Sequence, residues 1–256
     1  MRKRHSSAGR THLGYSYYKS SGFDRNKFRD SVRACLELGK NRLNPSLRDV
    51  DSLIFLQRAP ILMRWVSELP NDLLVLDVGG RIQPYRPVLQ PHTKTYIALD
   101  MQMEGLVDVI GTAERLPFLD DRFDVVICTD TLQYIPNPAL AIEEMHRVLR
   151  PKGKLLLSTR EAYPEHHDEY WRFLPNGLRH LTRRFVSVGI VPEGYSGSGL
   201  MIAMNVLLHR NIRSALIKEC CSRTSIPLIN KVGSFIDRFM HKDTRYACGV
   251  SLMAIK

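Results

Sequence analysis

The sequence has few of the features that mark secreted, membrane-spanning or metal-binding proteins. Its 256 residues include only five cysteines, and no two of them form a Cys-x-x-Cys pair. Neither a disulfide framework nor a zinc site is therefore expected, and a reducing cytosol fits this usage. The longest nearly apolar run, Leu200 to Leu208, is too short to cross a bilayer. No apolar stretch follows the basic residues 1–5, so we do not expect a signal peptide.

Acidic residues are scarce at both ends of the chain, although the net charge of the whole is only +11. Residues 1–70 carry 14 Lys and Arg against 6 Asp and Glu, and residues 178–256 carry 12 against 4. The middle is acidic, with 11 against 16. Such basic flanks favour binding to nucleic acid, to an acidic glycan or to an anionic membrane surface. The alternative is that they form only a solvated basic surface. We predict a cytoplasmic protein with peripheral membrane contact at the inner face.

The middle of the chain alternates between strand-like and helix-like stretches. Residues 73–78 form a short apolar run that two glycines end, which is typical of a strand buried on both faces. Further strands are expected at residues 95–99, 107–110, 123–128, 154–158, 185–191 and 246–255, and helices at residues 138–149 and 175–184. This alternation predicts βαβ units, hence an α/β fold with a parallel sheet. Three prolines, Pro84, Pro87 and Pro91, should leave only a short helical turn after the first strand.

Helical segments are expected at both ends of this middle region. Residues 1–70 predict a basic arm and a helical cap, with one helix starting near Asp24 and a second zone at residues 51–69 that Pro60 breaks. Residues 71–256 then form the main domain, with a helical insertion at about 199–241 made of two amphipathic helices. Their apolar stripes should face the core, a membrane-facing or dimer-forming surface being the alternative.

Two carboxylates, Asp77 and Asp100, point to the ligand. Both end predicted strands, and the carboxyl ends of strands in open α/β sheets are where ligands bind. Asp100 can accept hydrogen bonds from ribose hydroxyls, although a turn-forming acid is the alternative. Residues 79–84 do not fit the G-x-G-x-x-G fingerprint of dinucleotide sites, and Asp77 would repel a pyrophosphate. The carboxylate of Asp77 suits a cationic ligand such as S-adenosylmethionine, which has an ammonium group, a sulfonium group and an adenosine.

Five segments, in order, resemble the class I S-adenosylmethionine-dependent methyltransferases of the type 11 group. They are Val75-Leu76-Asp77-Val78-Gly79-Gly80, Asp100, Gly111-Thr112-Ala113-Glu114-Arg115-Leu116-Pro117-Phe118, Phe123–Thr129 followed by Leu132-Gln133-Tyr134-Ile135, and His146 to Leu155. The resemblance covers residues 72–190. It implies a Rossmann-like, seven-stranded, mostly parallel sheet with an antiparallel last strand, and a methyltransferase domain over residues 71–256. This chain departs from the pattern of the family at two positions. Arg81 stands where a glycine is usual, and Thr112 stands where an acid is usual.

The resemblance also implies the contacts to the cofactor. Asp77, Gly79 and Gly80 would lie near the methionine part, Asp100 and Met101 would flank the ribose, Ala113 and Glu114 would lie along the adenine, and Thr129 would lie near the sulfonium. A narrower resemblance rests on Gln83-Pro84-Tyr85-Arg86 and on Asp168-Glu169-Tyr170-Trp171-Arg172-Phe173. These are similar to segments of methyltransferases found with polysaccharide and cell-envelope glycan synthesis.

The loop after the fifth predicted strand carries the candidate acceptor-side residues. Methylation of an alcohol needs a base for its proton, and His166, His167 and Asp168 are the candidates, unless they are solvated or only bind substrate. Adjacent histidines do not readily share one ion, so no metal is expected. Tyr170, Trp171 and Arg172 would bind the acceptor, with core packing as the alternative for Trp171.

The resulting hypothesis is O-methylation of a sugar or glycan precursor, a small-molecule or glycan acceptor. A nucleic-acid methyltransferase is the first alternative, prompted by the basic flanks, although no N-P-P-Y motif or RNA-binding module is present. The second alternative is a non-catalytic relative that keeps the fold as a binding module, prompted by Arg81 and Thr112.

Overall fold

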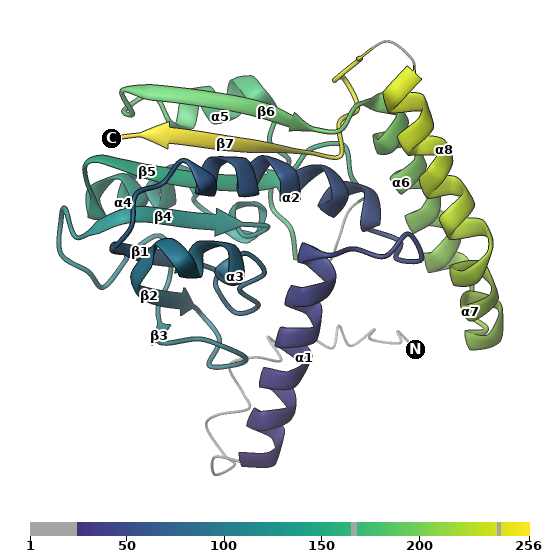
Figure 1. Ribbon diagram of the computed structural model, residues 1–256, viewed down its shortest axis with the longest axis horizontal. Helices are drawn as coiled ribbons and strands as arrows, with labels where there is room; N and C mark the ends of the chain where they lie inside the picture. The colour runs from purple at the N-terminus through teal and green to yellow at the C-terminus, as the bar shows by residue number, and fades with distance from the viewer. Residues whose placement is uncertain (1–24, 165–167, 240–241) are drawn as a thin grey trace, which may run out of the picture.

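A single seven-stranded sheet forms the centre of the protein, as Figure 1 shows. The computed structural model describes residues 25–164, 168–239 and 242–256. The strand order is β3-β2-β1-β4-β5-β7-β6. The strands are β1 Leu73–Val78, β2 Thr93–Asp100, β3 Val109–Ile110, β4 Phe123–Thr129, β5 Leu149–Arg160, β6 Ser187–Glu193 and β7 Gly249–Ile255. Strands β1 to β5 are parallel, while β7 is antiparallel to β5 and to β6. The expected Rossmann-like sheet with an antiparallel last strand is confirmed.

Helices surround the sheet. They are α1 Arg25–Leu43, α2 Ser52–Ser67, α3 Arg86–Leu89, α4 Pro138–Val148, α5 Pro175–Leu181, α6 Ser196–Asn211, α7 Ala215–Arg223 and α8 Ser225–Phe239, with 3-10 turns η1 Gln90–His92 and η2 Leu132–Tyr134. The prediction of only a short helical turn after β1 is confirmed, because α3 has four residues. Pro91, two residues beyond the end of α3, lacks the N–H group that a longer helix would need.

The central strands are apolar throughout because both faces of the sheet are covered. Val75 of β1 packs in one cluster with Leu62 and Trp65 of α2, whereas its neighbour Leu76 packs in another with Met145 of α4. Successive side chains of a strand point to opposite faces, so each strand contributes to both clusters. In Figure 1, α2 and α3 lie in front of the sheet and α4 and α5 behind it.

Helix α2 is unbroken, whereas the sequence predicts a break at Pro60, and strand β5 is longer than predicted. Helix α2 runs through Pro60 without a break, because the buried side chains around it, such as Leu53 and Leu62, offset the one lost hydrogen bond. Strand β5 includes the expected turn at residues 151–153. There the backbone of Lys256 accepts a bond from Lys152 N (2.9 Å) and donates one to Gly153 O (3.0 Å), which extends the pairing with the end of the chain.

The inserted region has three helices, α6, α7 and α8, instead of the two expected. They lie beyond the ends toward which the β4 and β6 arrows point in Figure 1, and α6 and α8 pack side by side. Two apolar helix residues are exposed: Leu140 of α4 by 41% and Leu36 of α1 by 47%. On α1, Cys35 and Gly39 are the buried residues instead. No helix within the described ranges is long and apolar enough to traverse a bilayer.

Candidate active site

The turn after β1 lies where the strand order changes direction, between β1 and β4. Ligands in open α/β sheets bind at this point. Gly79 has a φ of 79°, and a Cβ there would lie 2.1 Å from the Oγ1 of Thr131. The amides of Gly79 and Gly80 donate to the carbonyl of Leu99, at 2.8 and 3.1 Å. Glycine is therefore required at position 79 for a turn held between β2 and the segment after β4.

Asp77 is buried beneath this turn, with an exposed fraction of 4%. Its Oδ2 accepts a hydrogen bond of 2.6 Å from the hydroxyl of Tyr96. Burial raises the pKa of Asp77 from its usual 3.8 to about 7, although the bond from Tyr96 opposes the shift. Arg86 also lowers this pKa, but it does not offset the effect of burial. A cationic group in contact with the carboxylate would favour its ionised form.

Asp100 lies half-buried at the end of β2, one strand further along the same edge. Its Oδ1 accepts a bond of 3.0 Å from the amide of Gln102, and burial raises its pKa. The side chain of Arg81 reaches this loop, with Nη1 donating to Oε1 of Gln102 at 2.6 Å. The residue that replaces the usual glycine thus links the turn after β1 to the loop that carries Asp100. Met101 is 61% exposed beside it.

The other three expected cofactor contacts differ in their surroundings. Thr129 ends β4 and is 9% exposed, and Ala113 is buried at 8%. The Oε1 of Glu114 accepts a bond of 2.8 Å from the amide of Asn137, which is the N-cap of α4. Glu114 therefore already holds the start of this helix, whatever else it contacts.

A buried cluster of charges follows β4, and the sequence does not predict it. Asp130 lies 2.7 Å from Arg58 and 3.8 Å from Arg160, and Arg58 also binds Glu193 at 2.9 Å. Burial alone would raise the pKa of Asp130, but Arg58 and Arg160 hold it well below its ordinary value. Asp130 and Glu193 lie far from Arg58 along the chain. The one indication in the sequence is an arginine within the apolar run of α2.

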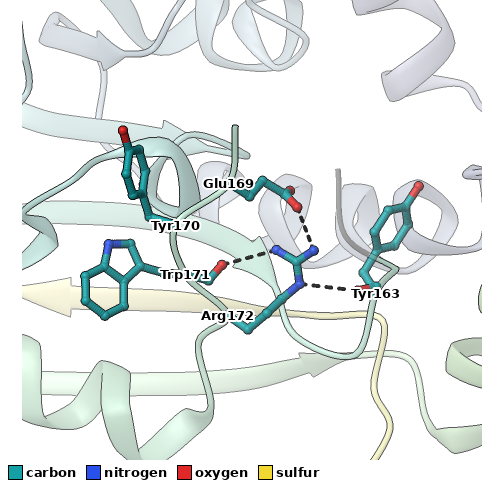
Figure 2. Close-up of a pocket in the computed structure, with 5 residues that line it drawn as sticks. All are labelled: Tyr163, Glu169, Tyr170, Trp171 and Arg172. Carbon is teal, nitrogen blue, oxygen red and sulfur yellow. Dashed lines mark hydrogen bonds and ion pairs between the residues drawn. The ribbon is translucent and has the colours of Figure 1, made fainter. Parts of the chain in front are cut away.

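A pocket of about 310 Å³ opens in the loop after β5, and Figure 2 shows the residues that line it. Arg172 donates to Glu169 Oε2 at 2.6 Å and to the carbonyls of Tyr163 (3.3 Å) and Trp171 (3.2 Å). Figure 2 shows the charged pair pointing together beside Tyr163, whereas the rings of Tyr170 and Trp171 extend the other way. These rings are 63% and 43% exposed, so Trp171 is not a core residue.

The pocket loop is fixed to the segment after β4. The amide of Tyr170 donates to the carbonyl of Gln133 at 2.8 Å, and the indole Nε1 of Trp171 donates to the carbonyl of Ile135 at 2.9 Å. That segment in turn touches the glycine turn through Thr131. Three segments of the carboxyl edge, after β1, β4 and β5, are therefore in contact.

The expected base is only partly covered by the structure. His166 and His167 lie outside the described residues, and Asp168 is exposed with a φ of 65°. Glu161, which directly follows β5, is a further acid that no motif of the sequence indicates. It is 9% exposed, and burial, with a contribution from Glu193, raises its pKa from 4.5 to about 7. It can therefore exchange a proton near neutrality.

Comparisons with known proteins identify the family of this chain. A family model described as "Methyltransferase domain" matches residues 76–157. The ubiquinone biosynthesis O-methyltransferase of Azotobacter vinelandii is 33% identical over 169 residues, which cover 56% of this chain and 72% of that protein. The demethylmenaquinone methyltransferase of Mycobacterium bovis is 37% identical over 92 residues, covering 34% and 37%.

The fold is also found among solved structures. One is phosphoethanolamine N-methyltransferase 2 of Haemonchus contortus, in complex with phosphomonomethylethanolamine and S-adenosylhomocysteine. It aligns with a TM-score of 0.54 and 14% identity, over 85% of this chain and 60% of that one. At this identity the likeness concerns the fold alone.

Proposed function

Because the chain belongs to the S-adenosylmethionine-dependent methyltransferases, we propose that it methylates a hydroxyl group on a ring-shaped small acceptor, specifically a sugar or glycan precursor. When bound, the cofactor supplies a methyl group on a positively charged sulfur. Methyl transfer is an in-line displacement, so the protein has to bind and orient its two substrates and exclude water from the site.

The cofactor would bind along the edge formed by β1, β2 and β4. Asp77 would accept hydrogen bonds from the ammonium group, with Gly79 and Gly80 against the methionine part. Asp100 and Met101 would lie at the ribose, Ala113 and Glu114 along the adenine, and Thr129 near the sulfonium. The buried carboxylate of Asp77 forms no salt bridge within the described residues, and its pKa stays raised although Arg86 lowers it; this observation best supports the assignment.

The acceptor would bind in the pocket after β5. Sugar rings are bound by aromatic faces for their C–H groups and by planar charged groups for neighbouring hydroxyls. The pocket offers both kinds of group, in Tyr170 and Trp171 on one side and in the Glu169–Arg172 pair on the other. The resemblance of residues 168–173 to glycan-associated methyltransferases supports the same acceptor class.

A phenolic acceptor is the second candidate, because the relative from Azotobacter vinelandii is a ubiquinone biosynthesis O-methyltransferase. A phenol would also stack on Trp171. A catechol-type phenol offers at most two adjacent hydroxyls to Glu169 and Arg172, whereas a sugar carries hydroxyls around most of its ring, and the pocket therefore favours a sugar.

Either hydroxyl must lose its proton to a base of this chain. His166 or His167, oriented by Asp168, would take it, and Glu161 is a further candidate because its pKa is near 7. Separate His166→Gln, His167→Gln and Glu161→Gln variants distinguish them. Loss of the base lowers kcat by about a hundredfold or more and flattens the pH profile. A variant that only disturbs binding changes KM instead.

The test is an acceptor panel with S-adenosylhomocysteine release as readout. It compares sugar precursors with catechol-type phenols, for the wild type, Trp171→Ala and the control Leu119→Ala, whose residue is 80% exposed outside the pocket. We expect turnover of a sugar and a rise in its KM of about tenfold in Trp171→Ala, equivalent to a stacking contact of about 1.4 kcal/mol. Turnover of phenols alone would refute the sugar assignment.

A further inference from the structure

One face of helix α8 is apolar yet exposed to solvent. Leu228, Val232, Phe235 and Phe239, which we call the α8 stripe, are 63%, 41%, 60% and 65% exposed. Their spacing of four, three and four residues places them on a single face of the helix. The rings of Phe235 and Phe239 lie together, with centroids 4.6 Å apart. Large apolar side chains gathered in this way mark an interaction surface.

The opposite face of α8 is already packed, so the stripe cannot turn inward. Asn230 donates to the backbone carbonyls of Leu47 (2.8 Å) and Asp49 (3.1 Å), and its Oδ1 accepts from Asn205 of α6 at 2.8 Å. Gly233 allows α6 to approach, because a Cβ there would lie 3.0 Å from the Cβ of Met201. The orientation of α8 is therefore fixed by buried contacts, and its apolar stripe remains outside.

The charges beside the stripe are positive. Lys231 and Arg238 are exposed on one flank, and the guanidinium of Arg238 lies 5.4 Å from the ring centroid of Phe239. The acid on this helix, Asp237, is buried and accepts bonds from the amides of Tyr195 and Ser198. It therefore does not neutralise the outer surface.

Helix α7 continues the same pattern. Leu216 and Ile217 are 85% and 54% exposed. Arg223 is paired with Glu219 at 2.7 Å, whereas Lys218 adds a positive charge. The helical pair α7–α8 thus presents apolar side chains with basic neighbours, the arrangement of helices that lie in a membrane interface.

We infer that the α8 stripe, together with α7, docks on the surface of an anionic lipid bilayer. Phenyl rings would enter the interface while Lys231 and Arg238 contact lipid phosphates. A second copy of the chain fits less well, because a two-fold interface through this face would put the basic residues of both copies into one interface, where α8 offers no exposed acid among its described residues to pair with them. The inserted helices lie beyond the ends of β4 and β6 in Figure 1. Docking there would leave the carboxyl edge of the sheet close to the membrane.

The test measures co-sedimentation of the full chain with vesicles of phosphatidylcholine, alone or mixed with phosphatidylglycerol. We expect binding to the anionic vesicles only, weakened by salt. A basic residue near such a surface is worth about 1 kcal/mol, or about fivefold in binding. The Lys231→Glu/Arg238→Glu double variant should therefore lose more than tenfold. Phe235→Ser/Phe239→Ser should lose a similar factor, and the control Leu119→Ser, which also removes an exposed apolar side chain, should bind as the wild type.

A Phe235→Trp variant gives a second readout that keeps the stripe apolar. Its fluorescence should shift to shorter wavelength with anionic vesicles and not with neutral ones. The inference is overturned if the wild type does not bind anionic vesicles or if all variants bind equally. It is also overturned if light scattering shows a dimer that Phe235→Ser/Phe239→Ser dissociates. Unchanged circular dichroism of the variants excludes misfolding as the cause of a loss.

Discussion

Replacing Asp77 by Asn separates what this residue costs the fold from what it contributes to cofactor binding. The pKa of Asp77 is raised by burial from 3.8 to about 7, so folding takes up a proton at intermediate pH. Below about pH 4 the carboxyl group of Asp77 is protonated in both the folded and the unfolded protein, so it does not destabilise the fold. As the pH rises from about 4 to about 7, the unfolded protein gains stability by ionising this group, and the free energy of unfolding decreases. Three pKa units correspond to about 4 kcal/mol at full ionisation.

Asn has nearly the same shape, and its carbonyl oxygen can still accept the bond from Tyr96. Asp77→Asn should therefore be more stable than the wild type by up to about 4 kcal/mol at about pH 8, with nearly equal stability at about pH 4. Urea unfolding at both pH values measures this difference. Equal stability of the two proteins at the higher pH would refute the reasoning, because Asp77 would then be ionised without cost.

The same variant should bind S-adenosylmethionine more weakly, because a charge-assisted hydrogen bond contributes about 1.5–3 kcal/mol. Calorimetry should show a loss of about tenfold or more at about pH 8. In the wild type, affinity should increase as the pH rises through about 7, since only the ionised carboxylate attracts the ammonium. An identical pH dependence in Asp77→Asn would contradict the assigned role.

Three further substitutions have expected outcomes. Gly79→Ala should lower the melting temperature and the cofactor affinity together, because its Cβ would meet Thr131 at a φ of 79°; unchanged scanning fluorimetry would contradict this. Arg58→Ala should lower the free energy of unfolding in urea by about 3–5 kcal/mol, because it removes the ion pair of the buried Glu193 and leaves Asp130 only the more distant Arg42 and Arg160. Arg81→Ala should raise the KM for the cofactor by about fivefold, since it frees the loop that carries Asp100; a lower KM would mean that Arg81 obstructs the site.

Much of the fold could be predicted because local patterns determined it. The apolar run of β1 and the prolines after it specify a buried strand and a broken helix without reference to the rest of the chain. The errors arise where distant contacts override such patterns. Pro60 lies within a continuous α2 because the helix is packed over its length, and β5 is extended by its pairing with the end of the chain.

The site could be predicted less completely. The positions of Asp77 and Asp100 at strand ends follow from the sequence, but the burial of the Asp77 side chain and its bond to Tyr96 depend on how β1 and β2 pair. The ion pairs of Arg58 join α2 to residues after β4 and at the end of β6, and no local pattern indicates them. The spacing of residues in a single sequence indicates local structure, but it does not indicate contacts between segments that are far apart in the chain.

Two buried acids at this edge, Asp77 and Asp130, differ in how far the positive charges of this chain balance their own charge. Both directly precede or follow the ends of central strands, and both lie within the protein interior. Asp130 is surrounded by the chain's own arginines, which keep its pKa low, so its charge is already balanced and an added cation would gain little. Asp77 accepts a hydrogen bond from Tyr96 and is within the influence of Arg86, but these do not offset the effect of burial, and its raised pKa reflects this deficit. A bound ammonium group would remove the deficit at Asp77, so cofactor binding and the stability of the central strand should be coupled at this residue.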